Sequence, residues 1–447
     1  MRTPHALRAL LIAAIAFLSS HAVAGGPFVV DENGTGVAAK WLNDTVTWYS
    51  ETGSLPGFGD NAAALQMVQE QFDKWQKAKL DGGDGTLVET ANVKSVRSDL
   101  GFDVNAENFR EHCYSSKATK TCVIFDSDGS ITDELMGTDS KETIIGLSQP
   151  ERFTIESGGV YITKGIIILN GYLSGKVDQE QFKAAVLHEI GHLLNLDHTQ
   201  INLDIGTSSD CTLENNCGDE GRFVPTMYPE LVSDRQGTLS YDDRITISWL
   251  YPKVENASDK FYPGFATITG EIFDRDGNPM QGVNVVAMRE GEGDEMARID
   301  ARSMISGALY PAYTENGRYY LYGLVPGKKY KVVAEPVYHL FTGPSGFEPI
   351  ENPPQNFEET VIKTPDDDEF VVAPGAGESL EMASLTLDVE NPCVEANACP
   401  SGYSGSSTST KKLCNMVPGG AFDAASAMWP LAALLSAGII ALRRKTR

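Results

Sequence analysis

Three histidines and one glutamate stand at fixed spacings in the stretch HEIGHLLNLDH, which runs from His188 to His198. On an α-helix, residues four apart lie on one face, so His188 and His192 direct two imidazoles toward one point, and Glu189 lies on the same turn. His198 brings a third imidazole only if the chain leaves the helix and reverses sharply. Asn195 stands at the turning position, and asparagine tolerates a left-handed backbone best after glycine.

Three imidazoles and one remaining position for water are a ligand set of catalytic zinc. Zinc lowers the pKa of that water toward neutrality, and Glu189 can take its proton and return it to a leaving amine. The motif therefore predicts a zinc-dependent endopeptidase acting on protein or peptide substrates, with His188, His192 and His198 as metal ligands and Glu189 as general base. The alternative is a cell-surface binding or adhesion protein with a structural metal, which requires a fourth protein ligand.

An α/β (α+β) domain with a twisted mixed sheet is expected around this motif, from residue 25 to 253. Apolar residues spaced by three and four predict a helix over 61–77, with Asp60 as its N-cap. A second helix over 178–194, capped by Asp178, carries the first two histidines. Strand-like runs cover 46–49, 144–147 and 160–169.

A second domain, from residue 264 to 390, has no helical period. Apolar runs at 268–273, 283–287, 317–322 and 329–334 are separated by turn residues, among them Pro326-Gly327. This pattern predicts a small antiparallel β-sandwich.

Both ends of the chain carry features of export. Residues 1–24 have two arginines, an apolar run and the small residues Ala22-Val23-Ala24, as in a signal peptide. At the other end, a linker over 391–423 precedes an apolar stretch and a basic tail over 424–447, which predicts a transmembrane helix. This helix is either a permanent anchor or is removed by sorting. The chain is expected in the cell envelope or at the cell surface, or released from it.

Composition supports an exported, folded protein. The 447 residues are 41% hydrophobic, enough for one sizeable core and a second smaller one. The formal net charge of −25 argues against nucleic acid as a partner. Seven cysteines suit an oxidising compartment, and their spacing suggests the pairs Cys113–Cys122, Cys211–Cys217 and Cys393–Cys399, with Cys414 left over.

The histidine motif, followed by Val224-Pro225-Thr226-Met227-Tyr228-Pro229, resembles the metzincin metallopeptidases, and Met-Tyr-Pro resembles their matrixin branch. The resemblance implies that Met227 forms an apolar floor below the metal ligands. It also implies that Pro229, Glu230 and Leu231 line the substrate pocket. The edge strand that holds a peptide substrate would fall near 143–148.

Two departures from the matrixin pattern are visible. The stretch between the third histidine and Met227 is longer than in vertebrate matrixins and contains Cys211 and Cys217, and no PRCGxPD cysteine-switch segment is present. Latency through a thiol on zinc is therefore not expected. Where two other metzincin branches have a zinc-binding tyrosine, this chain has Pro229, so a structural role is expected for Tyr228.

Three further resemblances complete the expectations. The second domain resembles the carboxypeptidase regulatory, transthyretin-like sandwich, which implies a spacer or binding role. The C-terminus resembles bacterial tripartite sorting signals, with Cys414 or Pro418-Gly419-Gly420 as the processing point. The acidic stretch with Asp126, Asp128 and Asp133 begins like a calcium loop, so it is either a Ca²⁺ site, as matrixins commonly have, or a plain turn.

Overall fold

The computed structural model describes residues 26–30, 37–81, 87–253, 264–291, 294–307, 317–337, 354, 356–390 and 414–418. The expected signal peptide, nearly all of the linker, the pair Cys393–Cys399 and the C-terminal transmembrane helix lie outside these residues. Within them, no helix combines the length and the apolar character that crossing a bilayer requires.

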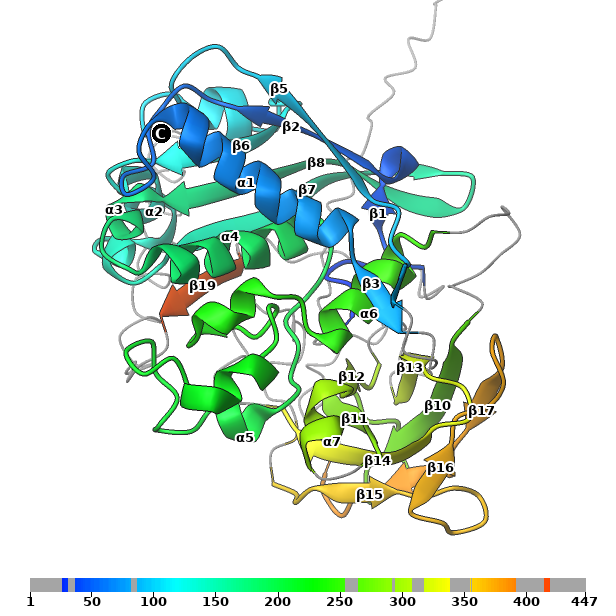
Figure 1. Cartoon of the computed structure of the whole chain (residues 1–447). Helices are drawn as coiled ribbons and strands as arrows, with labels where there is room; N and C mark the ends of the chain where they lie inside the picture. The colour runs from blue at the N-terminus through cyan, green and yellow to red at the C-terminus, as the bar shows by residue number, and fades with distance from the viewer. Residues whose placement is uncertain are drawn as a thin grey trace, which may run out of the picture.

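A mixed sheet forms the centre of the first part of the chain (Figure 1). Its strands follow the order β5-β2-β6-β8-β7-β19-β9, with β1 paired to β8. Strands β5, β2, β6 and β8 pair in parallel, whereas β7 runs antiparallel to β8. The bounds are β1 (Lys40–Trp41), β2 (Thr45–Ser50), β5 (Lys94–Asp99), β6 (Thr121–Asp126), β7 (Gly146–Glu156), β8 (Gly159–Asn170), β9 (Glu230–Leu231) and β19 (Cys414–Pro418); β3 (Lys79–Asp81) and β4 (Leu87–Glu89) form a separate pair.

Two long helices, α1 (Asn61–Gln76) and α4 (Gln179–Leu193), pack together on one face of this sheet (Figure 1). Asp60 and Asp178 cap them as predicted. The Trp75 indole of α1 donates to the Leu187 carbonyl of α4 at 2.9 Å. The remaining helical segments are α2 (Ser130–Met136), α3 (Gly171–Ser174), α5 (Leu203–Gly206) and α6 (Tyr241–Leu250), 3-10 turns at Leu42–Asp44, Ser140–Glu142, Gly218–Phe223 and Asp234–Gly237, and a π-turn at Arg110–Tyr114.

Strand β6 is buried on both faces, and the sequence pattern does not predict it. Val123 and Phe125 face the two helices, while Cys122 and Ile124 face a second apolar cluster on the other side of the sheet. A central parallel strand is apolar throughout and shows no alternation. The acidic stretch that follows is therefore the end of β6 and the start of α2.

Two of the three suggested cysteine pairs are confirmed as disulfides, Cys113–Cys122 and Cys211–Cys217. The first joins the π-turn to β6, and the second closes a loop beside a small apolar cluster that includes Tyr228. Both cross-links reduce the conformational freedom of the unfolded chain.

Two sheets enclose a second core in residues 264–390. The predicted strands are present, but β17 and β18 pair in parallel with β10, so the prediction of a purely antiparallel arrangement is wrong. A short helix, α7 (Asp294–Ile299), was also not expected. One sheet contains β13 (Arg318–Leu324), β10 (Ala266–Phe273), β17 (Ser379–Glu381) and β18 (Leu385–Thr386); the other contains β12 (Arg302–Ile305), β11 (Val283–Arg289), β14 (Lys329–Pro336), β15 (Thr360–Ile362) and β16 (Phe370–Val372).

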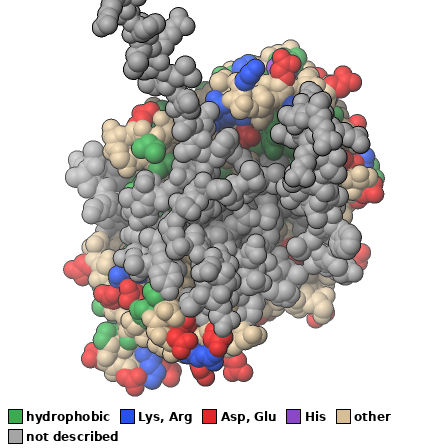
Figure 2. All heavy atoms as spheres, turned by 180° about the vertical axis from the view of Figure 1, so that it is seen from behind, with side chains coloured by type: hydrophobic (Ala, Val, Ile, Leu, Met, Phe, Trp, Pro, Cys, Tyr) green, Lys and Arg blue, Asp and Glu red, His purple; other side chains and the backbone are tan. Residues whose placement is uncertain are grey.

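Charged side chains lie mainly on the outside. On the face shown in Figure 2, acidic side chains are spread around the visible rim with lysines and arginines among them. Exposed ion pairs such as Arg275–Glu390 contribute well under about 1 kcal/mol each. The exclusion of nucleic acid thus rests on net charge alone and stays a prediction.

The two parts of the chain meet in a buried contact. The Arg302 guanidinium of β12 pairs at 2.5 Å with the Asp242 carboxylate of α6, and both side chains are almost fully buried. Asp242 also accepts from the Ser303 amide at 3.0 Å, and the Tyr241 hydroxyl donates to the Gly323 carbonyl at 2.8 Å. The second part is therefore attached through desolvated polar contacts, which are costly to break singly.

We expect Arg302→Ala to lower the free energy of unfolding by about 3–5 kcal/mol, because it leaves the Asp242 carboxylate buried without its cation. Urea denaturation of the purified protein measures this change. Arg275→Ala, which removes an exposed ion pair, is the control and should change the same quantity by less than about 1 kcal/mol. Equal changes in the free energy of unfolding for the two substitutions would show that the buried pair contributes no more to stability than the exposed pair.

Candidate metal centre

Helix α4 places the first two histidines and Glu189 in the protein interior. Asp178 accepts from the Glu180 and Gln181 amides at 2.8 and 3.4 Å and so fixes where the helix starts. His188, Glu189 and His192 are all fully buried. Since the helix is anchored to both α1 and the sheet, these three side chains are held on a rigid element.

The chain reverses after α4 as the motif requires. Asn195 has a φ of 75°, the left-handed conformation expected at this position. Its side chain also accepts from the Val29 amide at 2.8 Å and donates to the carbonyls of Val29 and Ala39 at 2.9 and 2.6 Å. The asparagine thus ties the reversal to the N-terminal segment, which glycine could not do.

The reversal brings His198 back to the helix. The Nε2 atom of His198 lies 3.1 Å from Nε2 of His192 and 3.2 Å from Nε2 of His188. Three nitrogens bound to one tetrahedral zinc at about 2.0–2.1 Å are separated by roughly 3.3 Å. Among the described residues, these three form the only group of His, Cys, Asp or Glu ligands close enough to share one ion.

Hydrogen bonds on the far side of two rings define their tautomers. Nδ1 of His188 lies 2.8 Å from the Thr226 carbonyl, and Nδ1 of His192 lies 2.9 Å from the Leu196 carbonyl. A carbonyl only accepts, so each Nδ1 carries the proton and each Nε2 presents a lone pair to the centre. Lone pairs converging at such distances repel unless a cation lies between them, so the donor set fits a metal ion.

Burial keeps the three rings in the neutral form. It lowers the pKa of His188 to about 4, and it lowers the pKa values of His192 and His198 well below their usual value. Neutral imidazole is the form that ligates metals. Imidazole ligands suit zinc, copper, iron and nickel, so this ligand set alone does not select the metal.

Met227 lies against the helix that carries the ligands. A Cβ atom added to Gly191 would collide with the Met227 sulfur, so the methionine packs directly on the helix between the two histidines. The Thr199 amide, next to the third histidine, donates to the Met227 carbonyl at 2.9 Å. Met227 therefore contacts both α4 and Thr199, the residue that follows the third histidine.

Asp243 supports the backbone of Thr226 and Met227, and the sequence predicts no role for this aspartate. Its carboxylate accepts from the amides of Thr226 at 2.9 Å and Met227 at 3.2 Å, and from the Ser240 amide at 2.7 Å. The Thr226 carbonyl in turn accepts from Nδ1 of His188. The Ser240–Asp243 capping pair at the start of α6 was visible in the sequence, but its second role depends on a long-range contact.

Glu189 lies next to the edge of the sheet. A Cβ atom added to Gly146, the first residue of β7, would lie 2.7 Å from Cγ and 3.0 Å from Oε1 of Glu189. Only glycine leaves room for this approach of strand and side chain. The carboxylate is thus placed between the β7 edge and the helix turn that carries His188 and His192.

The residues expected to line the substrate pocket lie two to four positions after Met227. Pro229 and Leu231 are buried, and Glu230 is half-buried. The partial desolvation of the Glu230 carboxyl raises its pKa. Glu230 and Leu231 form strand β9. Their role in substrate binding stays a prediction.

The three carboxylates of the possible calcium loop have separate protein partners. Asp126 accepts from the amides of Ile131 and Thr132 at 3.0 and 2.8 Å and so organises the start of α2. Asp128 accepts from the Ser130 amide at 3.0 Å, and Asp133 pairs with Lys141 at 3.2 Å. These contacts favour the turn interpretation, and calcium binding stays an untested prediction.

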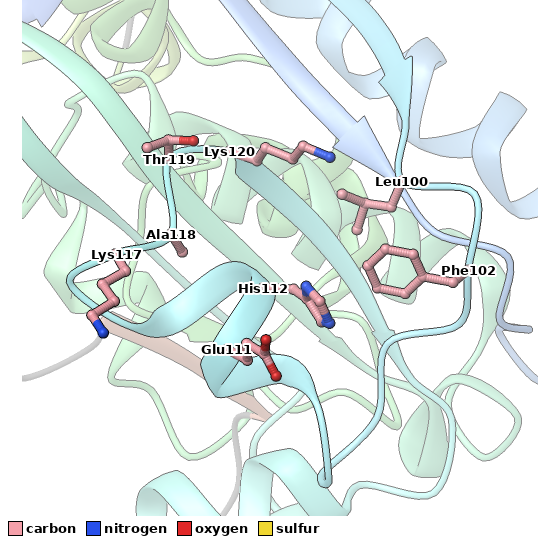
Figure 3. A pocket seen from close by; sticks show the side chains of 8 residues that line it. All are labelled: Leu100, Phe102, Glu111, His112, Lys117, Ala118, Thr119 and Lys120. Carbon is pink, nitrogen blue, oxygen red and sulfur yellow. The ribbon is translucent and has the colours of Figure 1, made fainter.

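A pocket of about 200 Å³ is present elsewhere on the domain (Figure 3). It contains none of the predicted site residues. The lining residues are Leu100, Phe102, Glu111, His112, Lys117, Ala118, Thr119 and Lys120.

We expect Asn195→Gly to keep the left-handed turn but lower the free energy of unfolding by about 2–4 kcal/mol, because it removes three buried hydrogen bonds. Asn195→Ala should cost more, since it also strains the backbone. Urea denaturation separates the two variants. A glycine variant as stable as the wild type would show that the bonds to Val29 and Ala39 contribute nothing.

We also expect the purified protein to bind about one transition-metal ion per chain, and its Tm to fall on chelation, because the ion stabilises only the folded state. Elemental analysis and calorimetry measure both quantities. His198→Ala is the comparison variant, and its Tm should respond much less to the chelator. A wild-type protein free of metal after purification and unchanged by added zinc would contradict this expectation.

Comparison with known proteins gives no family. No family model matches the chain, and no curated protein matches it. Among solved structures, a dioxygenase domain from Streptomyces sp. SirexAA-E is 20% identical over 28% of this chain and 80% of that chain, with a TM-score of 0.18. A 9R-lipoxygenase from Cyanothece PCC8801 is 11% identical over 30% of this chain and 18% of that chain, with a TM-score of 0.16. Similarity this low supports no statement about fold or function.

Proposed function

We propose that this protein is an exported zinc-dependent endopeptidase of the metzincin type, similar to the matrixin branch. The observation that carries the proposal is the convergence of three neutral, buried imidazoles on one point, with the carboxylate of Glu189 on the same helix turn. His188, His192 and His198 would hold the ion. When bound, zinc supplies an electrophile that acidifies water and polarises a peptide carbonyl.

The chain's own residues supply the proton transfer and the binding of substrate. Glu189 takes a proton from the attacking water and later gives it to the leaving amine nitrogen. Strand β7, whose first residue contacts Glu189, offers backbone groups to an extended peptide. Pro229, Glu230 and Leu231 would line the pocket for the substrate side chain.

Several structural features support this proposal over a closed, structural metal site. Among the described residues, the ligand group contains three side chains and no fourth. Met227 packs on the helix at Gly191, which supports the role as apolar floor that we propose for it. The two disulfides suit an oxidising compartment outside the cytoplasm.

We expect Glu189→Gln to retain about one zinc per chain but to lower kcat/KM for peptide hydrolysis by about 10²–10⁴-fold, because the amide cannot accept the proton. Unfolded casein and a peptide library serve as substrates, and metal content is measured in parallel. The control is Glu180→Gln at the exposed start of the same helix, which should hydrolyse peptides normally. Undiminished hydrolysis by Glu189→Gln, with metal retained, would refute this mechanism.

A further inference from the structure

The segment Cys414–Pro418 lies beside helix α4 as strand β19 (Figure 1). Its residues Cys414, Asn415 and Met416 pair antiparallel with Ser148, Leu147 and Gly146 of β7, in that order. Val417 and Pro418 then pair in parallel with Glu230 and Leu231 of β9. One short segment therefore connects the sheet edge to the segment that follows Met227.

The register places this segment next to the catalytic carboxylate. Met416 pairs with Gly146, where an added Cβ atom would collide with the Glu189 side chain. Strand β19 also contacts α4, the helix that carries Glu189 and two histidines. The next residues of β19 pair with two of the three residues proposed for the substrate pocket.

A peptide substrate needs the same backbone groups. To place its carbonyl near Glu189, an extended substrate would lie along the edge of β7 that faces away from β8, where main-chain hydrogen bonds hold it irrespective of its sequence. Those edge groups at 146–148 are already paired with β19. Two strands cannot occupy one edge position, so β19 and substrate exclude each other.

We propose that residues 414–418 are an intramolecular inhibitor that occupies the substrate-binding edge of β7 until it is displaced or removed. This proposal rests on the proposed peptidase function. Because the segment belongs to the same chain, its local concentration at the edge is of the order of millimolar, so even weak pairing blocks the edge much of the time. Activity would then depend on the release of the C-terminal segment.

The test uses full-length protein with the substitutions Asn415→Pro and Met416→Pro together. Proline has no amide hydrogen and disfavours strand pairing, so β19 should leave the edge. We expect kcat/KM for a peptide substrate to rise about tenfold or more. Hydrogen exchange at residues 146–148 should accelerate by a similar factor, because their pairing with β19 is lost.

Two comparison variants separate the loss of strand pairing from a general effect of proline and from an effect of the thiol. Ser406→Pro together with Ser407→Pro makes the same change in the preceding linker and should alter neither quantity. Cys414→Ser removes the thiol but not the backbone pairing, so activity and exchange should stay at wild-type values. A rise in activity with Cys414→Ser equal to that of the proline variant would overturn the proposal and assign inhibition to the thiol.

Hydrogen exchange also separates this proposal from the peptidase function, since it needs no activity. If exchange accelerates but every form is inactive toward peptides, the peptidase function fails while the pairing of β19 stands. Unchanged exchange at 146–148, or accelerated exchange with unchanged kcat/KM in an active enzyme, overturns the inhibitor.

Discussion

The candidate metal centre depends on one chain reversal directly after α4. Two of its ligands belong to a rigid helix, but the third reaches them only because Asn195 adopts a left-handed conformation. The reversal is held from outside by the asparagine side chain, which bonds to Val29 and Ala39. Without these contacts the nitrogen of His198 would not be fixed about 3 Å from the other two. The side chain of Asn195, which a glycine at the turn would lack, is therefore part of what builds the site.

Support for this centre extends outward through polar contacts. Asp243 holds the amides of Thr226 and Met227, and the Thr226 carbonyl orients His188. The neighbouring Asp242 forms the buried pair with Arg302 of the second part. The hydroxyl oxygen of Thr199, next to the third histidine, lies 3.1 Å from the hydroxyl oxygen of Ser303 in β12. The second part thus contacts the elements that position the metal ligands, which a simple spacer would not need to do.

Local signals in the sequence predicted the two long helices and the convergence of the three histidines. Capping by Asp60 and Asp178 and regular apolar spacing located α1 and α4, since both signals act within a few residues. Strand β6 was missed because burial on both faces removes the alternation that marks a strand, and its acidic end resembled a metal-binding turn. The role of Asp243 was missed because its partners are 16 and 17 residues away. Pairing of β19 with β7 joins residues more than 260 positions apart, which no local pattern encodes.

The edge of β7 poses two conflicting demands. An enzyme that binds extended peptides must keep one strand edge accessible, yet an accessible edge also pairs with unrelated chains and promotes aggregation. Gly146 brings this strand so close to Glu189 that no side chain fits between them, so a peptide paired with this edge lies near the carboxylate. A covering strand from the same chain meets both demands, since it protects the edge by backbone pairing and can be displaced without unfolding the core. Strand β19 lies between β7 and β9, where the proposed inhibitor would meet both demands. Control of access would then lie in the part of the chain that was expected to carry a linker and a processing point.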